Sequence, residues 1–168
     1  TKLFYTGKRE YANQSLEDSF LQALADGGHQ VGELAKQYFP GGVEVNTLNA
    51  AEALAQTQAL LARDEAIIYE AAISHNNLLV CVDVLIKRPG AIQLIEVKAK
   101  SYNADKDGDF RNKSGRPDSR WKPYLYDIAF QKYVTLAAFP DYEVSSYLML
   151  ADKKAACQTD GLNLKFLL

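Results

Sequence analysis

The chain has 168 residues, of which 48% are hydrophobic and 24% carry a charge. These values are typical of globular proteins, and the length predicts one domain, residues 1–168, that buries its own core. The 19 Lys and Arg residues against 21 Asp and Glu residues give a net charge of −2. This balance excludes a polycation that binds nucleic acid over its whole surface, although it is compatible with a local basic patch.

The sequence also indicates where the protein acts. It contains no stretch of about 18 apolar residues, and its first residues lack the apolar core of a signal peptide, so we expect no membrane partner. Its two cysteines, Cys81 and Cys157, are too far apart for a C-x-x-C motif and too few for an iron–sulfur cluster. We therefore expect a reducing, cytoplasmic location. The missing initial Met and the apolar last residues suggest a piece of a longer protein, although processing would leave the same ends.

Residues 1–64 are predicted to be mainly helical. Ser15, followed by an acid three residues later, begins the first helix, and Gly27–Gly28 ends it. A second helix is expected over residues 30–39. A third begins at the N-cap Asn49 and ends near residues 63–64.

Residues 65–168 are predicted to form the sheet core. Apolar, β-branched runs indicate strands over residues 66–73, 78–86, 92–98 and 143–150, with a short last strand over 162–168. A helix is expected over residues 124–138, and because it is apolar on all sides we expect it to be well buried. This order predicts an α/β (α+β) fold in which helices flank a mixed sheet.

The hairpin formed by the second and third strands contains the most informative residues. Asp83 lies in an otherwise apolar strand, where a carboxylate is costly unless it is paired or binds a metal. Glu96 and Lys98 are two residues apart on the next strand and so share a face. With a two-residue turn at Pro89–Gly90, residues 88 and 91 pair, so the residue numbers of each cross-strand pair add up to 179. This register places Asp83 opposite Glu96, with their Cβ atoms roughly 5 Å apart. A three-residue turn would instead place Asp83 opposite Ile95.

Two carboxylates at this separation repel each other unless a cation lies between them. Carboxylate oxygens suit Mg²⁺ or Mn²⁺, and Lys98 would then orient a water nucleophile or stabilise charge on a phosphate. In the alternative interpretation, Glu96 and Lys98 form an ion pair on an exposed sheet face, and Asp83 is a core acid with its own partner.

Asp83, the run Glu96-Val97-Lys98 and a later helix with Gln131 resemble the PD-(D/E)XK nuclease superfamily, in particular its RecB-like exonucleases, which include CRISPR-associated adaptation exonucleases. The resemblance covers roughly residues 28–150. It implies a restriction-endonuclease-like fold and Mg²⁺-dependent hydrolysis of DNA in repair, recombination or defence. Asp83, Glu96 and the Val97 carbonyl would be metal ligands, Lys98 the catalytic lysine and Gln131 a further active-site residue.

The chain departs from the family pattern in four respects. Val82 replaces the proline of the name-giving motif, and Thr135 stands where a Q-x-x-x-Y motif has its tyrosine. The Gly-x-x-x-His motif of the RecB-like branch lacks its histidine. Glu33 is the candidate for the additional metal ligand, unless it is an ordinary exposed glutamate; the other candidates are His29, which also suits a loop, and Glu70, which could equally face solvent. The four cysteines of the branch's iron–sulfur cluster are absent from the chain.

The polar segment 101–122 is predicted to lack regular structure and to contact substrate. Between Lys98 and Lys122 there are eight Lys or Arg residues and four Asp residues, which leaves +4 in a chain of net charge −2. Aromatic residues are interleaved with these cations, a combination that suits phosphate contacts and base stacking. A solvated flexible loop is the other interpretation. The candidate DNA-contacting residues are Lys100, Arg111, Lys113, Arg116, Arg120, Trp121 and Lys122.

The sequence therefore favours a metal-dependent deoxyribonuclease, and the family resemblance favours an exonuclease over a restriction-type endonuclease. The first alternative is an inactive nucleic-acid-binding or structural module with the same fold. A small-molecule hydrolase with a carboxylate metal site is the second, but no Gly-rich phosphate loop or nucleophile elbow supports it.

Overall fold

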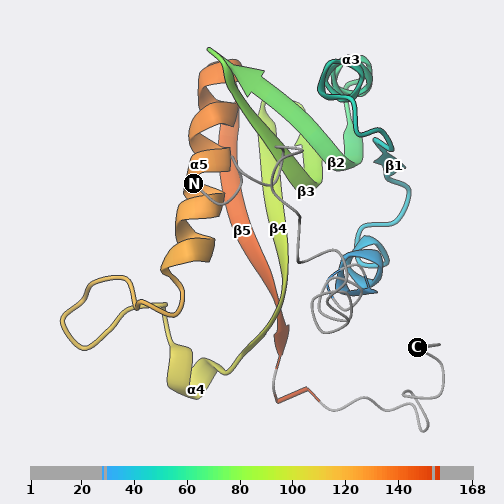
Figure 1. Cartoon of the computed structure of the whole chain (residues 1–168). Helices are drawn as coiled ribbons and strands as arrows, with labels where there is room; N and C mark the ends of the chain where they lie inside the picture. Colours follow the sequence, from blue (N-terminus) through green and yellow to red (C-terminus); the bar gives the residue numbers. More distant parts are fainter. Residues whose placement is uncertain (1–27, 29, 153, 156–168) are drawn as a thin grey trace, which may run out of the picture.

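The computed structural model describes residues 28, 30–152 and 154–155 (Figure 1). Three features expected from the sequence lie outside these residues: the helix that begins at Ser15, the candidate ligand His29, and the last strand over residues 162–168.

The described residues form a five-stranded mixed sheet in the order β1-β2-β3-β4-β5. The central strands β2, β3 and β4 are antiparallel, whereas β1 and β5 run parallel to their neighbours β2 and β4. The predicted α/β class with a mixed sheet and flanking helices is confirmed. The strands are β1 (Val43–Glu44), β2 (Ala66–His75), β3 (Leu78–Arg88), β4 (Ala91–Tyr102) and β5 (Glu143–Asp152).

Helix α3 (Ala50–Leu61) begins directly after the predicted N-cap Asn49, whereas helix α5 (Lys122–Ala138) begins two residues before the predicted start at residue 124. The Asn49 side chain accepts hydrogen bonds from the backbone N–H groups of Ala51 and Glu52, at 3.0 and 3.1 Å, and so caps α3. A proline in the first turn of α5 starts that helix without losing an intrahelical hydrogen bond. A further helical segment covers residues 30–36.

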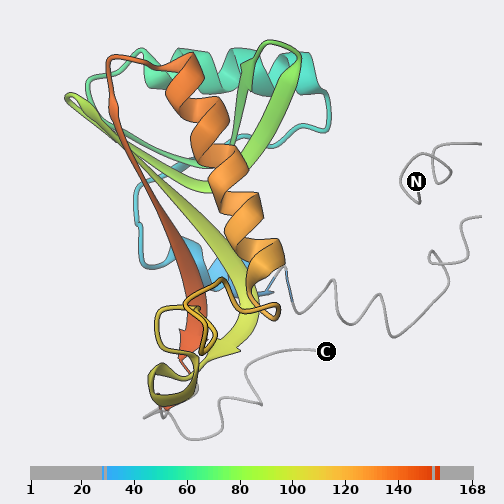
Figure 2. The ribbon, with the colours of Figure 1, turned by 90° about the vertical axis from the view of Figure 1, so that its left-hand side faces the viewer.

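The two faces of the sheet bury different clusters. The larger cluster joins the sheet to α3 and α5, through residues such as Leu60, Leu94 and Val134. Figures 1 and 2 show α5 lying across this face of the sheet. The smaller cluster, on the other face, joins β2, β3 and β4 to Phe39, which follows the helical segment 30–36. Each face is therefore covered by a different part of the chain.

Helix α5 is less buried than its composition predicts. Ile128, Gln131, Val134 and Thr135 are buried against the sheet. In contrast, Tyr126, Phe130 and Tyr133 are exposed on the outer side. The expectation of a well-buried helix was wrong because aromatic residues counted as apolar occupy its solvent face.

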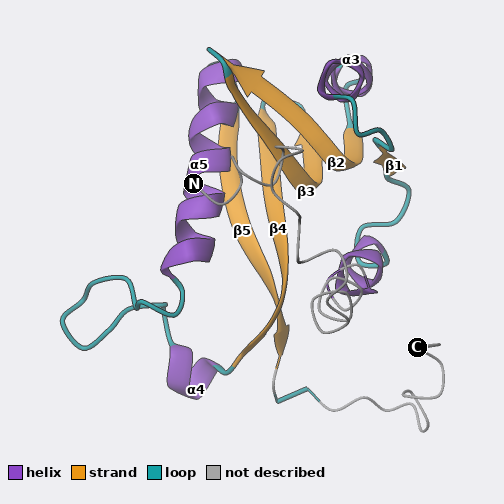
Figure 3. Ribbon diagram, in the orientation of Figure 1, coloured by secondary structure: helices purple, strands orange, loops and turns teal. Residues whose placement is uncertain are grey.

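The segment between β4 and α5 is mostly loop, with one short helix that the sequence did not predict. We call residues 103–121 the basic arm; it contains the short helix α4 (Ala104–Asp107) and extends from one end of the sheet (Figures 1 and 3). An isolated antiparallel bridge joins Arg111 to Pro117, and Asn112 Oδ1 accepts hydrogen bonds from the loop between them. This local pairing gives the tip of the arm a defined backbone.

Candidate active site

The β3–β4 turn sets the register predicted from the sequence. Arg88 pairs with Ala91 across the turn, and the ladder continues to the pair Val84 and Ile95, so that partner numbers sum to 179. Asp83 on β3 and Glu96 on β4 are the residues that come directly after this last pair. The two-residue turn is thus confirmed, although Asp83 and Glu96 themselves are not ladder partners.

Asp83 also falls at an interruption of the β2–β3 ladder. Tyr69 pairs with Val84 and Ala71 pairs with Val82, so the ladder omits Glu70 and Asp83. Glu70 has φ of 56°, a left-handed conformation that is costly for a residue with a side chain. Both ladders of β3 are therefore open at Asp83, whose Oδ2 accepts a hydrogen bond from the Val97 N–H at 2.6 Å.

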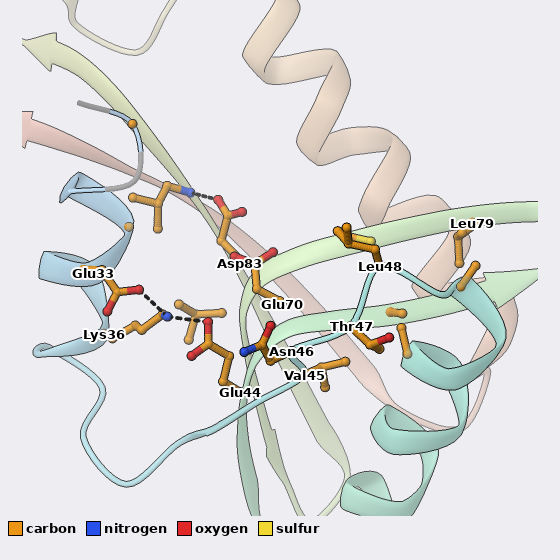
Figure 4. Close-up of a pocket in the computed structure, with 18 residues that line it drawn as sticks. Glu33, Lys36, Glu44, Val45, Asn46, Thr47, Leu48, Glu70, Leu79 and Asp83 are labelled. Atoms are coloured by element: carbon orange, nitrogen blue, oxygen red, sulfur yellow. Dashed lines mark hydrogen bonds and ion pairs between the residues drawn. The ribbon is translucent and has the colours of Figure 1, made fainter. Parts of the chain in front are cut away.

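A cavity of about 660 Å³ lies on the Asp83 side of this interruption, and Asp83, Glu70, Val97 and Cys81 contribute to its wall (Figure 4). Figure 4 shows the carboxylates of Glu70 and Asp83 next to each other, and the charge of Glu70 acts on Asp83. Both alternatives for Glu70 therefore hold in part, because its side chain lies beside Asp83 and is also exposed to solvent.

Glu33 lines the same cavity from the helical segment 30–36. Its side chain is 70% exposed, and Oε1 is 2.5 Å from the Lys36 ammonium, which also lies 2.7 Å from Glu44 Oε1. Tyr69 fixes this segment on the sheet by donating a hydrogen bond from its hydroxyl to the Phe39 carbonyl at 2.5 Å. Glu33 thus faces the same space as Asp83 but is held by an ion pair with Lys36.

Glu96 points to the opposite face, toward α5. It is only 3% exposed, and its Oε2 accepts a hydrogen bond from Gln131 Nε2 at 2.5 Å. Gln131 is itself 4% exposed, and its Oε1 has no hydrogen-bond partner within the described residues. The predicted proximity of Gln131 to the hairpin is therefore present, as a direct contact with Glu96.

Lys98 bridges two acids from different elements. Its ammonium contacts Glu96 Oε1 and lies 3.2 Å from Oδ2 of Asp127, which is on α5. The ion pair of the alternative interpretation is thus present, but at a largely buried position rather than on an exposed sheet face. Asp127 was not among the residues predicted from the sequence.

These contacts leave the pKa values of the three hairpin residues perturbed. Burial raises the pKa of Asp83, and the Glu70 charge adds to this effect. Burial also raises the pKa of Glu96, against the opposing hydrogen bond from Lys98. Burial lowers the pKa of Lys98, but its contacts with Glu96 and Asp127 outweigh this and raise the net pKa.

Asp83→Asn should stabilise the protein in a pH-dependent way. Because the folded state raises the pKa of Asp83, ionisation of this carboxyl costs stability as the pH rises above the ordinary aspartate value of about 3.9. Asparagine removes the charge and keeps an oxygen for the Val97 N–H. In EDTA, we expect the variant's Tm to match wild type near pH 3.5 and to exceed it at about pH 7, by roughly 2–4 °C per kcal/mol gained. Thermal unfolding across this range measures it, and a pH-independent difference would contradict the prediction.

The atoms available around the hairpin are of the chemical type that a hard divalent cation binds. Two carboxylates, Asp83 and Glu96, and the Val97 carbonyl are all oxygen donors, which Mg²⁺ and Mn²⁺ prefer. Within residues 28, 30–152 and 154–155, no group of three or more His, Cys, Asp or Glu side chains is arranged to hold a metal ion. Mg²⁺ needs no such group, because it commonly binds to one or two carboxylates and keeps waters or substrate phosphate as its other ligands.

The predicted DNA-contacting residues have different environments in the basic arm. Trp121 is only 1% exposed, so it packs inside the arm and does not present its ring for base stacking as the sequence suggested. Arg120 is 3.0 Å from Asp118 and 3.2 Å from Asp107. Lys113 and Arg116 are exposed and make no ion pair with any described residue. Both of these tip cations are thus accessible.

Of the remaining three candidates, Lys100 and Lys122 lie near the base of the arm and Arg111 lies at its tip. Lys100 donates a hydrogen bond to the Arg120 carbonyl at 3.0 Å, and its ammonium lies over the ring of Trp121. Arg111 is 3.1 Å from Asp109, and Lys122 is exposed at the start of α5. Lys100 and Arg111 therefore combine a structural contact with their positive charge.

Comparison with known proteins adds no assignment. No protein-family model matches the chain, and no curated protein matches it significantly. Among the helices of the described residues, none is both long and apolar enough to cross a membrane.

Proposed function

We propose that this chain is a divalent-cation-dependent deoxyribonuclease of the PD-(D/E)XK type that its sequence resembles. The observation that carries the proposal is the position of Asp83, Glu96 and Lys98 around the point where both ladders of β3 open. The raised pKa values of buried Asp83 and Glu96 add support, since perturbed carboxylates gather at functional sites.

Asp83, Glu96 and the Val97 carbonyl would hold Mg²⁺ or Mn²⁺ at the opening between β3 and β4, where the charge of Asp83 acts on Glu96 although the two side chains point to opposite faces. The bound cation would supply Lewis-acid chemistry, by making water a better nucleophile and by stabilising negative charge on the phosphate. The acids Glu70 and Glu33 face the same cavity as Asp83 and would add negative potential that attracts the cation.

The other side chains perform the remaining tasks. Lys98 would orient the attacking water or bind a phosphate oxygen through its ammonium. Gln131 fixes the orientation of Glu96 through the 2.5 Å hydrogen bond from its amide. The accessible cations of the basic arm, Lys113 and Arg116, would contact the DNA backbone and give binding without sequence specificity.

The second candidate function is a catalytically inactive nucleic-acid-binding module. It is favoured by the partners of Glu96, both of whose oxygens are already occupied by Lys98 and Gln131. Such a module can be told apart from a nuclease by experiment: it should bind DNA but cleave it in no divalent cation. In either case we expect the protein to act in the cytoplasm, where the exposed free thiol of Cys81 would stay reduced.

Glu96→Ala should abolish cleavage. We expect wild-type protein to cleave end-labelled single- or double-stranded DNA in Mg²⁺ or Mn²⁺ and not in EDTA. The variant should lose at least about 100-fold in rate, since even residues that only support a metal ligand cost 10–100-fold when removed. The length of the labelled products over time separates exonuclease from endonuclease activity and gives the polarity.

Glu65→Ala is the matched control, because Glu65 is an exposed acid outside the cavity and the hairpin. It should cleave at the wild-type rate. If wild-type protein bound DNA but cleaved it in neither Mg²⁺ nor Mn²⁺, the nuclease proposal would be wrong and the inactive binding module would be supported.

A further inference from the structure

Lys98 has two anionic partners that differ strongly in burial. The Glu96 side chain is 4% exposed, whereas the Asp127 side chain, 3.2 Å from the Lys98 ammonium, is 45% exposed. Glu96 comes from the same strand as Lys98, and Asp127 comes from α5. The ammonium thus lies between a buried acid of the sheet and a half-exposed acid of the helix.

The two partners of Glu96 are not equally replaceable. Gln131 is buried, and its main chain is part of α5, so its amide is held against Glu96. Lys98 has a flexible side chain that is 28% exposed. Any cation that binds Glu96 must therefore displace Lys98 from Oε1, since a divalent cation and an ammonium repel each other at one carboxylate oxygen.

A displaced Lys98 needs another anion or it moves into solvent. Asp127 is already in contact with the ammonium and lies four residues before Gln131, so both side chains project from the same side of α5. The helix thus presents two groups to the hairpin, one for Glu96 and one for Lys98.

We propose that Asp127 is a positioning residue that keeps the Lys98 ammonium beside the reacting phosphate once Glu96 binds the divalent cation. This inference rests on the proposed nuclease function. It assigns Asp127 two effects: it lowers the competition between Lys98 and the cation for Glu96, and it restricts Lys98 to orientations useful for catalysis.

The test compares wild type with Asp127→Asn and Asp127→Glu. Binding of Mn²⁺ alone is measured by titration calorimetry, and kcat and KM are measured on a short labelled DNA. For Asp127→Asn we expect weaker Mn²⁺ binding and a kcat lower by about 10–100-fold, with little change in KM, as for other residues that support a metal site. Asp127→Glu should recover most of both losses, and the exposed Asp141→Asn should behave as wild type.

A double-mutant cycle with Lys98→Met separates positioning from a general structural role. If Asp127 acts through Lys98, adding Asp127→Asn to Lys98→Met should not change Mn²⁺ affinity further. Wild-type Mn²⁺ affinity and kcat in Asp127→Asn would overturn this inference alone, as would an equal loss of affinity in both backgrounds. Failure of wild type to bind Mn²⁺ or to cleave DNA would overturn the proposed function, and this inference with it.

Discussion

Replacing Lys98 by methionine should separate cation binding from catalysis. Methionine keeps most of the length of the side chain and removes the ammonium that contacts Glu96 and Asp127. We expect the cleavage rate to fall by about 10²–10³-fold, the usual loss when a donor to developing charge is removed. Affinity for Mn²⁺ should rise at the same time, because Lys98 no longer occupies an oxygen of Glu96.

Single-turnover cleavage and Mn²⁺ titration calorimetry measure the two effects on one preparation. Lys132→Met is the matched control, since Lys132 is on α5 but makes no ion pair within the described residues. Loss of the Lys98 ammonium leaves Glu96 buried without its cation, which can destabilise the fold. The double variant Lys98→Met/Glu96→Gln removes both charges and should restore the Tm. Cleavage by Lys98→Met at the wild-type rate would show that Lys98 has no catalytic role.

The hairpin could be predicted from sequence because its determinants are local. A two-residue turn at Pro89–Gly90 fixes the register of every following pair, and the alternation of β4 places Glu96 and Lys98 on one face. The cap at Asn49 and the apolar strands are local signals of the same kind. Such features need no knowledge of distant residues.

The relation of Asp83 to Glu96 depends on information that the hairpin itself does not contain. The interruption at Asp83 lies opposite Glu70 of β2, which has a φ of 56°. Glycine, asparagine and aspartate are the residues that predict such a conformation, and glutamate does not. Because of this interruption, Asp83 lines the cavity while Glu96 points toward α5. A strictly regular pair of strands would place both on the same face.

Contacts between the hairpin and α5 could be predicted only in part. The spacing of Asp127 and Gln131 shows that they share a helix face, but not which residues that face meets. Their partners, Lys98 and Glu96, are set by how α5 docks on the sheet through buried residues such as Val134. Docking is a tertiary property, so Asp127 became a candidate only with the structure.

Substitution of Trp121, the only tryptophan of the chain, should strongly lower the stability of the protein, because this residue is buried in the basic arm. The Trp121 ring centroid lies 5.0 Å from that of Phe110 and 6.0 Å from that of Tyr102, and the Lys100 ammonium lies 4.7 Å from its ring. This cluster is what fixes the arm to the end of the sheet. Trp121→Ala should lower the free energy of unfolding by about 3–5 kcal/mol, as for other buried aromatic residues.

The same substitution should weaken DNA binding, because the tip cations would lose their fixed position. Urea unfolding measures the stability, and anisotropy of a labelled oligonucleotide in EDTA measures the affinity at several salt concentrations. Trp121→Phe, which keeps an aromatic ring in the cluster, should restore much of both.

A triple variant separates the charge of the tip from the stability of the arm. Replacing Arg111, Lys113 and Arg116 by glutamine should leave the free energy of unfolding within about 0.5 kcal/mol of wild type, as for most surface substitutions. It should lower the salt dependence of single-strand binding by about 0.7 in log–log slope for each phosphate that the arm no longer neutralises. An unchanged slope would mean that the arm does not bind DNA. The Trp121 cluster would then serve only to stabilise the fold, and DNA would have to approach the hairpin from the cavity side, where Glu33, Glu70 and Asp83 repel phosphate unless a cation is bound.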